Sequence, residues 1–114
     1  GCGGDRDKGK RPIMGRIGGE LADLCILTSD NPRTEDPMEI LREIEEGIKE
    51  TTGEYVVIEN RRDAIRHALE IGREGDIIVL CGKGHETYQE TMGVKRPFDE
   101  KVVVQELLTE LRGE

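Results

Sequence analysis

Three short apolar runs, separated by segments with helical periodicity, constrain the fold of this chain more than any other feature. The runs cover residues 24–28, 55–58 and 76–81. Continuous apolar runs of this length, rich in β-branched residues, are typical of strands that a parallel sheet buries on both faces. The alternation of strand and helix therefore predicts the α/β class, with a Rossmann-like, mostly parallel sheet flanked by helices and right-handed crossovers.

The segments between the runs carry helix signals. Helical periodicity predicts a first helix near residues 11–21, with Pro12 in its first turn. Asp36 and Pro37 start a second helix, and Asn60 caps a third that ends at Gly72. The stripes expected to be buried are, in the three helices in turn, Ile13, Met14, Ile17 and Leu21; Ile40, Leu41, Ile44 and Ile48; and Ala64, Ile65, Ala68 and Leu69.

The two ends of the chain depart from this alternation. Residues 88–98 carry Met92 and Gly93 between two short runs, which predicts a small hairpin near the C-terminus, and Asp99 then caps a last helix. At the other end, a glycine-rich loop leads directly into the first helix. Because such a loop normally follows a strand, we expect a first strand upstream of Gly1 that this sequence lacks.

Length and charge narrow the classes of partner. The 114 residues fit one domain, residues 1–114, built around a single core. The formal charge of −8 repels a phosphate backbone and the few aromatic residues form no base-stacking surface, so we expect no nucleic-acid partner. The sequence has no apolar run of membrane-spanning length, and its first residues show no signal-peptide pattern. We therefore expect a cytoplasmic monomer with no membrane partner.

The three cysteines, Cys2, Cys25 and Cys81, are an odd number at wide spacing, which does not fit a disulfide framework. A zinc site built from these thiols and His85 would lack the closely spaced ligand pair typical of structural zinc. We therefore expect free thiols and no metal site.

Three polar segments follow strands that are predicted or inferred: residues 1–11, 29–33 and 82–86. In a parallel α/β sheet, ligands bind at such places, beyond the carboxyl ends of the strands. The first segment approaches a phosphate-binding loop, because Gly4, Gly9 and Lys10 have Walker A spacing, but Arg11 stands where that motif needs a hydroxyl. A solvated basic turn is the alternative for this segment.

The other two segments combine turns with charged side chains. In residues 30–33, Pro32 restricts the backbone and Arg33 is suited to binding a carboxylate through two parallel hydrogen bonds, with an ordinary Asx-Pro turn as the alternative. Residues 82–86 contain two glycines that permit close approach of a ligand, with a lysine, a histidine and a carboxylate. The sequence therefore predicts a ligand site at this edge of the sheet.

Taken together, the segments resemble a known family. The chain is similar to the C-terminal domain of the Mur ligases at three motifs: GGDRDKGKRP at 3–12, TSDNPR at 28–33 and GKGHE at 82–86. The resemblance extends from Gly1 to about Leu111, nearly the whole chain. Within the family, the Asp-Asn-Pro-Arg form of the second motif goes with members that add meso-diaminopimelate.

The resemblance implies a part of a larger, peptide-bond-forming ligase. Mur ligases have three domains, so an N-terminal domain that holds the UDP-sugar and a central ATPase domain are expected outside these residues. In this family, ATP converts the terminal carboxylate of UDP-N-acetylmuramoyl-L-alanyl-D-glutamate into an acyl phosphate, which the amine of meso-diaminopimelate attacks. ATP and Mg²⁺ are held mainly by the central domain. The resemblance therefore implies that this chain delivers the amino acid and that, alone, it has no catalytic residue, no cofactor and no activity.

The resemblance also assigns residues to ligands. It implies that meso-diaminopimelate is held by Arg6, Asp30, Asn31, Pro32, Arg33, Gly82 and Glu86. It places Asp5 and Lys8 where related ligases contact the nucleotide. Diaminopimelate has two amino-acid ends, and the residue chemistry agrees with this substrate: Arg33 can bind a carboxylate, whereas Glu86 and the Gly82 carbonyl can bind an ammonium.

Two other interpretations of the sequence stay open: a free-standing α/β module that binds a nucleotide or phosphorylated metabolite, and a purely structural α/β domain. Under the ligase interpretation, the crossover rule places the ends of parallel strands at one edge of the sheet. We therefore predict that Arg6, Asn31, Arg33, Gly82 and Glu86 surround one shallow open cleft there.

Overall fold

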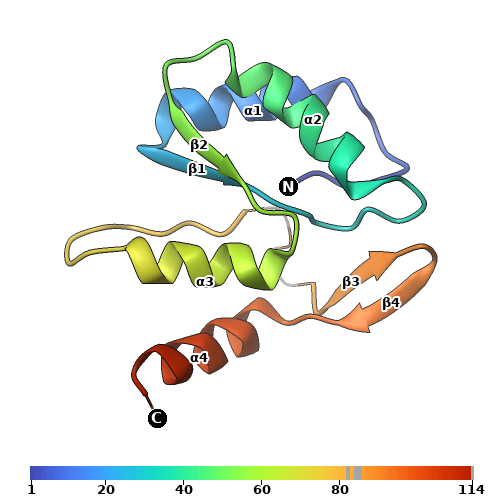
Figure 1. Ribbon diagram of the computed structural model, residues 1–114. Helices are drawn as coiled ribbons and strands as arrows, with labels where there is room; N and C mark the ends of the chain where they lie inside the picture. Colours follow the sequence, from blue (N-terminus) through green and yellow to red (C-terminus); the bar gives the residue numbers. More distant parts are fainter. Residues whose placement is uncertain (82, 84–85, 114) are drawn as a thin grey trace.

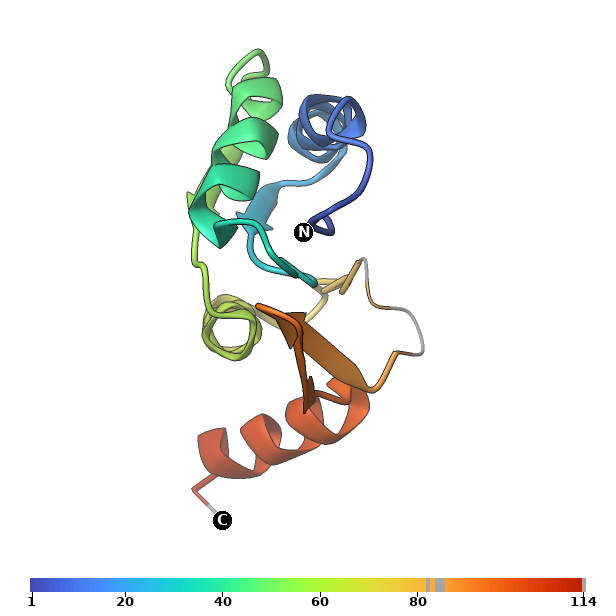
Figure 2. The same ribbon diagram turned by 90° about the vertical axis from the view of Figure 1, so that its right-hand side faces the viewer.

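The computed structural model describes residues 1–81, 83 and 86–113. Its elements follow in the order α1 (Lys10–Leu21), β1 (Leu24–Leu27), α2 (Pro37–Ile48), β2 (Glu54–Val57), α3 (Arg61–Ile71), β3 (Tyr88–Thr91), β4 (Val94–Pro97) and α4 (Glu100–Leu111). Figures 1 and 2 show α1 and α2 side by side on one face of the β1–β2 pair, with α3 on the other side and α4 beyond α3. The α/β class expected from the sequence is confirmed.

The strands of the described residues form two short sheets. β1 and β2 pair in parallel, in register from Leu24 opposite Glu54 to Leu27 opposite Val57, as the first two apolar runs predicted. β3 and β4 form the antiparallel hairpin that was expected near the C-terminus, and Gly93 in its turn has a φ of +78°. The parallel pairing places the loop after β1 and the loop after β2 at the same edge.

Two apolar clusters form the core. The first contains the predicted stripe of α2 with one residue each from the first loop and β1: Ile40, Leu41, Ile44, Ile48, Cys2 and Leu27. The second joins α3 to α4 through Ile65, Val103 and Leu107, with the partly buried Leu69, Phe98 and Val104 packed against them. The stripes predicted for α2 and α3 therefore face the core.

Three helices begin at the predicted caps. The side chains of Asp36, Asn60 and Asp99 each accept a hydrogen bond from a backbone N–H group in the first turn of α2, α3 and α4. Each cap satisfies a donor that has no partner within its helix. None of the helices in the described residues is both long and apolar enough to cross a membrane.

The buried face of α1 differs from the prediction. Its expected apolar stripe is 40% to 82% exposed and consists of Ile13, Met14, Ile17 and Leu21. Glycines lie at the contact with α2 instead: a Cβ on Gly15 would stand 2.0 Å from the Ile44 carbonyl oxygen, and one on Gly47 would stand 1.7 Å from the Pro12 carbonyl oxygen. The two helices therefore pack backbone against backbone, and this close approach decides which face of α1 is buried.

Residues 76–81 also depart from the prediction. They form no strand, and Ile77 and Val79 are 88% and 71% exposed. A strand requires a neighbouring backbone that pairs with its N–H and C=O groups, and no described segment pairs with this run. The first strand expected upstream of Gly1 stays a prediction.

Replacing Gly47 by alanine is expected to destabilise the domain, because the added Cβ has no space beside the Pro12 carbonyl. Overpacking of this kind costs about 1–3 kcal/mol, and each kcal/mol lowers the midpoint of thermal unfolding of a domain this small by about 4–8 °C. Circular dichroism during heating measures the midpoint. Gly9→Ala is the matched control, because Gly9 has helical backbone angles and its Cβ would meet only the end of the Asp7 side chain. Equal midpoints would contradict the backbone-to-backbone packing.

Candidate functional site

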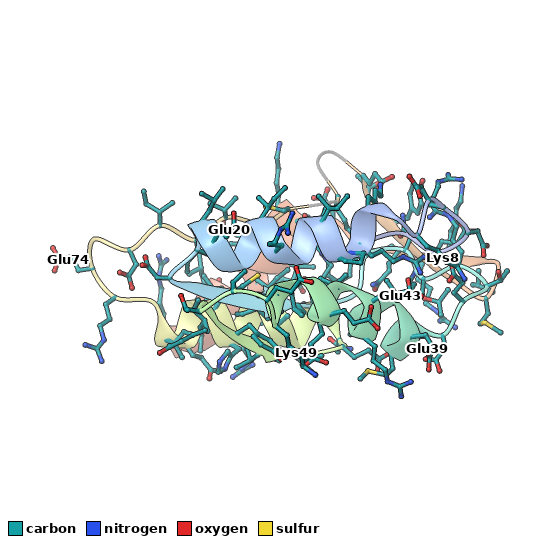
Figure 3. The ribbon with its side chains drawn as sticks, turned by 90° about the horizontal axis from the view of Figure 1, so that it is seen from above. Lys8, Glu20, Glu39, Glu43, Lys49 and Glu74 are labelled. Atoms are coloured by element: carbon teal, nitrogen blue, oxygen red, sulfur yellow. The ribbon has the colours of Figure 1, made fainter. Side chains whose placement is uncertain are left out.

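Arg11, in the first turn of α1, anchors the loop that precedes this helix (residues 1–9, the first loop). Its side chain is fully buried, and Nη2 donates hydrogen bonds to the Gly3 carbonyl oxygen at 3.0 Å and to the Glu35 carboxylate at 2.9 Å. Nη1 donates to Glu35 at 3.2 Å and to Glu43 at 2.7 Å, and Figure 3 shows Glu43 on α2 beside α1. Arg11 therefore joins the first loop to the loop after β1 and to α2.

The Glu35 carboxylate receives several donors at once. Besides the Arg11 bonds, it accepts a hydrogen bond from the backbone N–H of Asp5 and lies 3.6 Å from Lys8 Nζ. These contacts, the Arg11 hydrogen bond first among them, lower the pKa of Glu35 from 4.5 to about 2. The same hydrogen bond raises the pKa of Arg11, so the pair stays ionised at neutral pH.

Asp5 and Lys8, which were expected to contact the nucleotide, lie on this first loop. Asp5 has a left-handed φ of +54°, and its carboxylate accepts hydrogen bonds from the backbone N–H and the hydroxyl of Thr34. The Lys8 side chain is 65% exposed. The Asp5 carboxylate is therefore engaged within the domain, whereas Lys8 presents its ammonium to solvent. A nucleotide contact by either residue stays a prediction.

Arg33 and Arg6 both lie beside Gly3. Arg33 has a left-handed φ of +54°, its Nη1 donates to the Gly4 carbonyl oxygen at 2.9 Å, and its Nε lies 3.6 Å from the Glu90 carboxylate. A Cβ on Gly3 would stand 2.7 Å from Arg33 Nη1 and 3.5 Å from Arg6 Cγ. A larger residue at position 3 would therefore push against the Arg33 guanidinium, and the absence of a side chain at Gly3 leaves room for it.

Asn31 connects this loop to the third polar segment. It is 1% exposed, and its Oδ1 accepts hydrogen bonds from Lys83 Nζ at 3.0 Å and from the Glu90 backbone N–H at 2.9 Å. Its Nδ2 donates to the Glu86 carboxylate at 3.4 Å. Asn31 and Glu86, two of the predicted site residues, are therefore in direct contact.

Asp30 is used within the fold. Its Oδ1 accepts a hydrogen bond from Lys83 Nζ at 3.1 Å, and its carbonyl oxygen accepts one from the Gln89 side chain at 2.7 Å. Gly82, which was also expected to bind diaminopimelate, lies outside the described residues. The structure thus groups the expected residues that it describes, while their role in binding the amino acid stays a prediction.

A cavity of about 220 Å³ opens beside the loop after β1. Its walls come from that loop, from the β2–α3 connection and from β3, and Pro32 is the expected site residue that lines it. Arg6, Arg33 and Glu86 do not line this cavity, so the cleft predicted around them stays a prediction.

One buried residue that no sequence motif singled out, Arg61, holds the end of β1 in place. Arg61 is buried and donates hydrogen bonds to the Ser29 and Cys81 carbonyl oxygens at 3.1 and 3.0 Å and to the Glu100 carboxylate at 3.0 Å. It therefore joins the end of β1 to the start of α4. The only local signal is a basic residue in the first turn of a helix, where the helix dipole disfavours it, and Arg11 shares that signal.

The described residues contain no group of three or more His, Cys, Asp or Glu side chains placed to hold a metal ion. The three cysteines are free thiols. Burial raises the pKa of the Cys2 and Cys25 thiols, so both stay protonated at neutral pH. The zinc alternative also requires His85, which lies outside the described residues.

Comparison with known proteins identifies the family. A family model described as "Mur ligase, glutamate ligase domain" matches residues 1–84 of this chain. The chain belongs to the Mur ligase C-terminal domain family. This Mur ligase domain is similar, along nearly its whole length, to curated proteins named UDP-N-acetylmuramoyl-L-alanyl-D-glutamate--2,6-diaminopimelate ligase.

Two such relatives show the extent of the similarity. The ligase of Caldanaerobacter subterraneus subsp. tengcongensis is 60% identical over 110 residues, which are 96% of this chain and 23% of the relative. The ligase of Clostridium botulinum is 55% identical over 111 residues, which are 97% of this chain and 23% of the relative. A solved structure of a ligase with the same name matches with a TM-score of 0.92 and 46% identity, over 98% of this chain and 23% of that chain. This Mur ligase domain thus spans less than a quarter of the length of these relatives.

The low pKa of Glu35 predicts a pH-dependent loss of stability. The unfolded chain protonates Glu35 near pH 4.5 and the folded chain only near pH 2, so the ionised carboxylate stabilises the fold above pH 4.5. This contribution is lost as the pH falls from about 4.5 to 2. We expect Glu35→Gln to lower the urea midpoint at pH 7, and the difference from wild type to shrink steadily below pH 4.5.

Urea unfolding at several pH values, followed by circular dichroism, measures this dependence. Glu20→Gln is the matched control, because Glu20 is an exposed carboxylate on α1 that lies 4.0 Å from Arg16, and its loss should change the midpoint little. A Glu35→Gln difference that stays constant from pH 7 to pH 3 would show that ionisation of Glu35 does not stabilise the fold.

Proposed function

We propose that this chain is the amino-acid-binding domain of a ligase that joins meso-diaminopimelate to UDP-N-acetylmuramoyl-L-alanyl-D-glutamate in peptidoglycan synthesis (UDP-N-acetylmuramoyl-tripeptide synthetase, MurE). The relatives and the solved structure described above carry the name of such a ligase, at 46% to 60% identity. The observation that carries the proposal is the grouping of Arg6 and Arg33 around Gly3, at the edge where Asn31 holds Glu86.

Opposite charges at this edge match the two poles of an amino acid. In the described part of the chain, the recorded contacts of Arg33 use Nη1 and Nε, and we assign Nη2 to the substrate carboxylate. Arg6, which also lies beside Gly3, adds a second guanidinium. Glu86 supplies the negative charge for the ammonium group. Gripping one amino-acid end in this way leaves the second amine of diaminopimelate outside the domain, where it can react.

The activating chemistry belongs to other parts of the longer protein. ATP, with Mg²⁺, turns the terminal carboxylate of the UDP-linked dipeptide into an acyl phosphate. The amine nitrogen then attacks the acyl carbon, phosphate leaves, and the nitrogen gives up a proton. Arg11, which stands where a Walker A motif needs a hydroxyl, is fully buried and bound to carboxylates, so this loop does not form a Walker A phosphate site.

The domain therefore holds and orients the incoming amine, and its effect on rate comes from alignment of the reacting atoms. Lys8 is the side chain of this loop that we assign to the nucleotide, because its ammonium is exposed. We propose that the full-length ligase is a cytoplasmic monomer.

In the full-length ligase, Arg33→Lys is expected to lower kcat/KM for meso-diaminopimelate about 10- to 100-fold. Lysine keeps the charge but lacks the planar guanidinium, whose Nη1 and Nε contacts within the domain hold Nη2 in place for the substrate carboxylate. A charge-assisted hydrogen bond contributes about 1.5–3 kcal/mol, which is about one to two powers of ten in affinity. Steady-state kinetics with the amino acid varied gives the ratio. Arg42→Lys, at an exposed ion pair on α2, is the matched control. Kinetics like wild type for Arg33→Lys would exclude the carboxylate contact.

Glu86→Gln is expected to raise KM for meso-diaminopimelate about 10-fold and to leave KM for ATP nearly unchanged. The amide keeps the shape of the side chain but removes the charge that faces the ammonium. The measurement varies each substrate in turn while the others are saturating. Glu46→Gln, an exposed carboxylate on α2, controls for the loss of one negative charge. Equal losses for both substrates would place the effect of Glu86 on the fold rather than on the amino acid.

A further inference from the structure

Lys83, in the third polar segment, is a buried cation that contacts the loop after β1. Its side chain is 0% exposed, and Nζ donates hydrogen bonds to Asp30 Oδ1 at 3.1 Å, Asn31 Oδ1 at 3.0 Å and the Tyr88 carbonyl oxygen at 2.8 Å. The Phe98 ring centre lies 5.9 Å from Nζ. The three donors of the ammonium each have an acceptor, and one acceptor is a carboxylate that balances the buried charge.

These contacts decide which way the Asn31 amide points. Its Oδ1 receives both Lys83 Nζ and the backbone N–H of Glu90, at 3.0 and 2.9 Å. If the amide were turned over, its NH₂ group would face these two donors, so the observed orientation is the one that satisfies both sides. Nδ2 is therefore directed to the Glu86 carboxylate, which it meets at 3.4 Å.

We propose that Lys83 is a positioning residue for amino-acid binding, which acts by fixing the Asn31 amide so that Asn31 holds the Glu86 carboxylate ready for the substrate ammonium. The role rests on the proposed function. A neutral amide donor orders the carboxylate without cancelling its charge, so Glu86 keeps its attraction for a cation. Without Lys83, the amide loses one of the two donors that fix it, and Glu86 is less well ordered before the substrate binds, which weakens binding.

Lys83→Met in the full-length ligase tests the role of the ammonium. Methionine keeps an unbranched side chain beside Phe98 but donates no hydrogen bond. We expect KM for meso-diaminopimelate to rise about 10-fold, while kcat and KM for ATP change little. Lys49→Met is the matched control, because Lys49 is exposed just after the end of α2, away from the first loop and Lys8 (Figure 3).

Asn31→Asp tests the contact between Asn31 and Glu86. The aspartate keeps an acceptor for Lys83 and for the Glu90 N–H. The group that faces Glu86 then becomes an oxygen, so we expect a similar rise in KM for the amino acid. A third comparison combines Lys83→Met with Asn31→Ala. If Lys83 acts through Asn31, adding Lys83→Met to Asn31→Ala raises KM little further, whereas a merely structural lysine would give additive effects.

An unchanged KM in Lys83→Met or in Asn31→Asp would overturn the positioning role. So would equal losses for ATP and diaminopimelate, or additive effects in the double variant. A wild-type ligase that shows no turnover dependent on meso-diaminopimelate would overturn the proposed function itself, and with it this role. The two failures are therefore distinguished by the wild-type assay.

Discussion

Buried cations fix the conformation of the loops at the C-terminal ends of β1 and β2. Arg11, Arg61 and Lys83 are each nearly inaccessible to solvent, and each binds at least one carboxylate together with a backbone oxygen. A buried charge without partners would cost more free energy than a domain of marginal stability can supply. The loops must therefore keep their oxygens on these cations, and this requirement fixes how the three polar segments meet.

The same requirement divides the polar side chains of the site into two groups. Asp30 and Asn31 turn their side-chain oxygens inward to Lys83, whereas Arg6 is exposed and Arg33 and Glu86 are only partly buried. The motifs that resemble a ligand-binding set thus contain residues that shape the site and residues that can reach a ligand. Under the proposed function, a substitution in the first group would weaken amino-acid binding through disorder of the site, and one in the second group through loss of a direct contact.

Local signals predicted much of this fold. The caps at Asp36, Asn60 and Asp99 and the parallel pairing of β1 with β2 followed from short stretches of sequence. Two predictions were wrong: the buried face of α1 and a strand at residues 76–81. Both features depend on which element packs or pairs with the segment. The site shows the same division. The loop after β1 followed from its strand, but the strand predicted before the third polar segment does not form. The bonds of the buried cations to carboxylates join residues 24 to 53 positions apart, which no local pattern reports.

The glycine contact between α1 and α2 extends this dependence to a part of the domain without any substrate contact. Because Gly47 lets the two helix backbones touch, the first turn of α1 lies close enough to α2 for Arg11 to bind Glu43 and the Gly3 carbonyl at the same time. The two arginines that we assign to the substrate carboxylate both lie beside Gly3. Their separation therefore follows from helix packing as well as from the loop itself. Under the proposed function, stability and amino-acid binding share one series of contacts, so a change in the packing of α1 would alter binding without touching the amino acid.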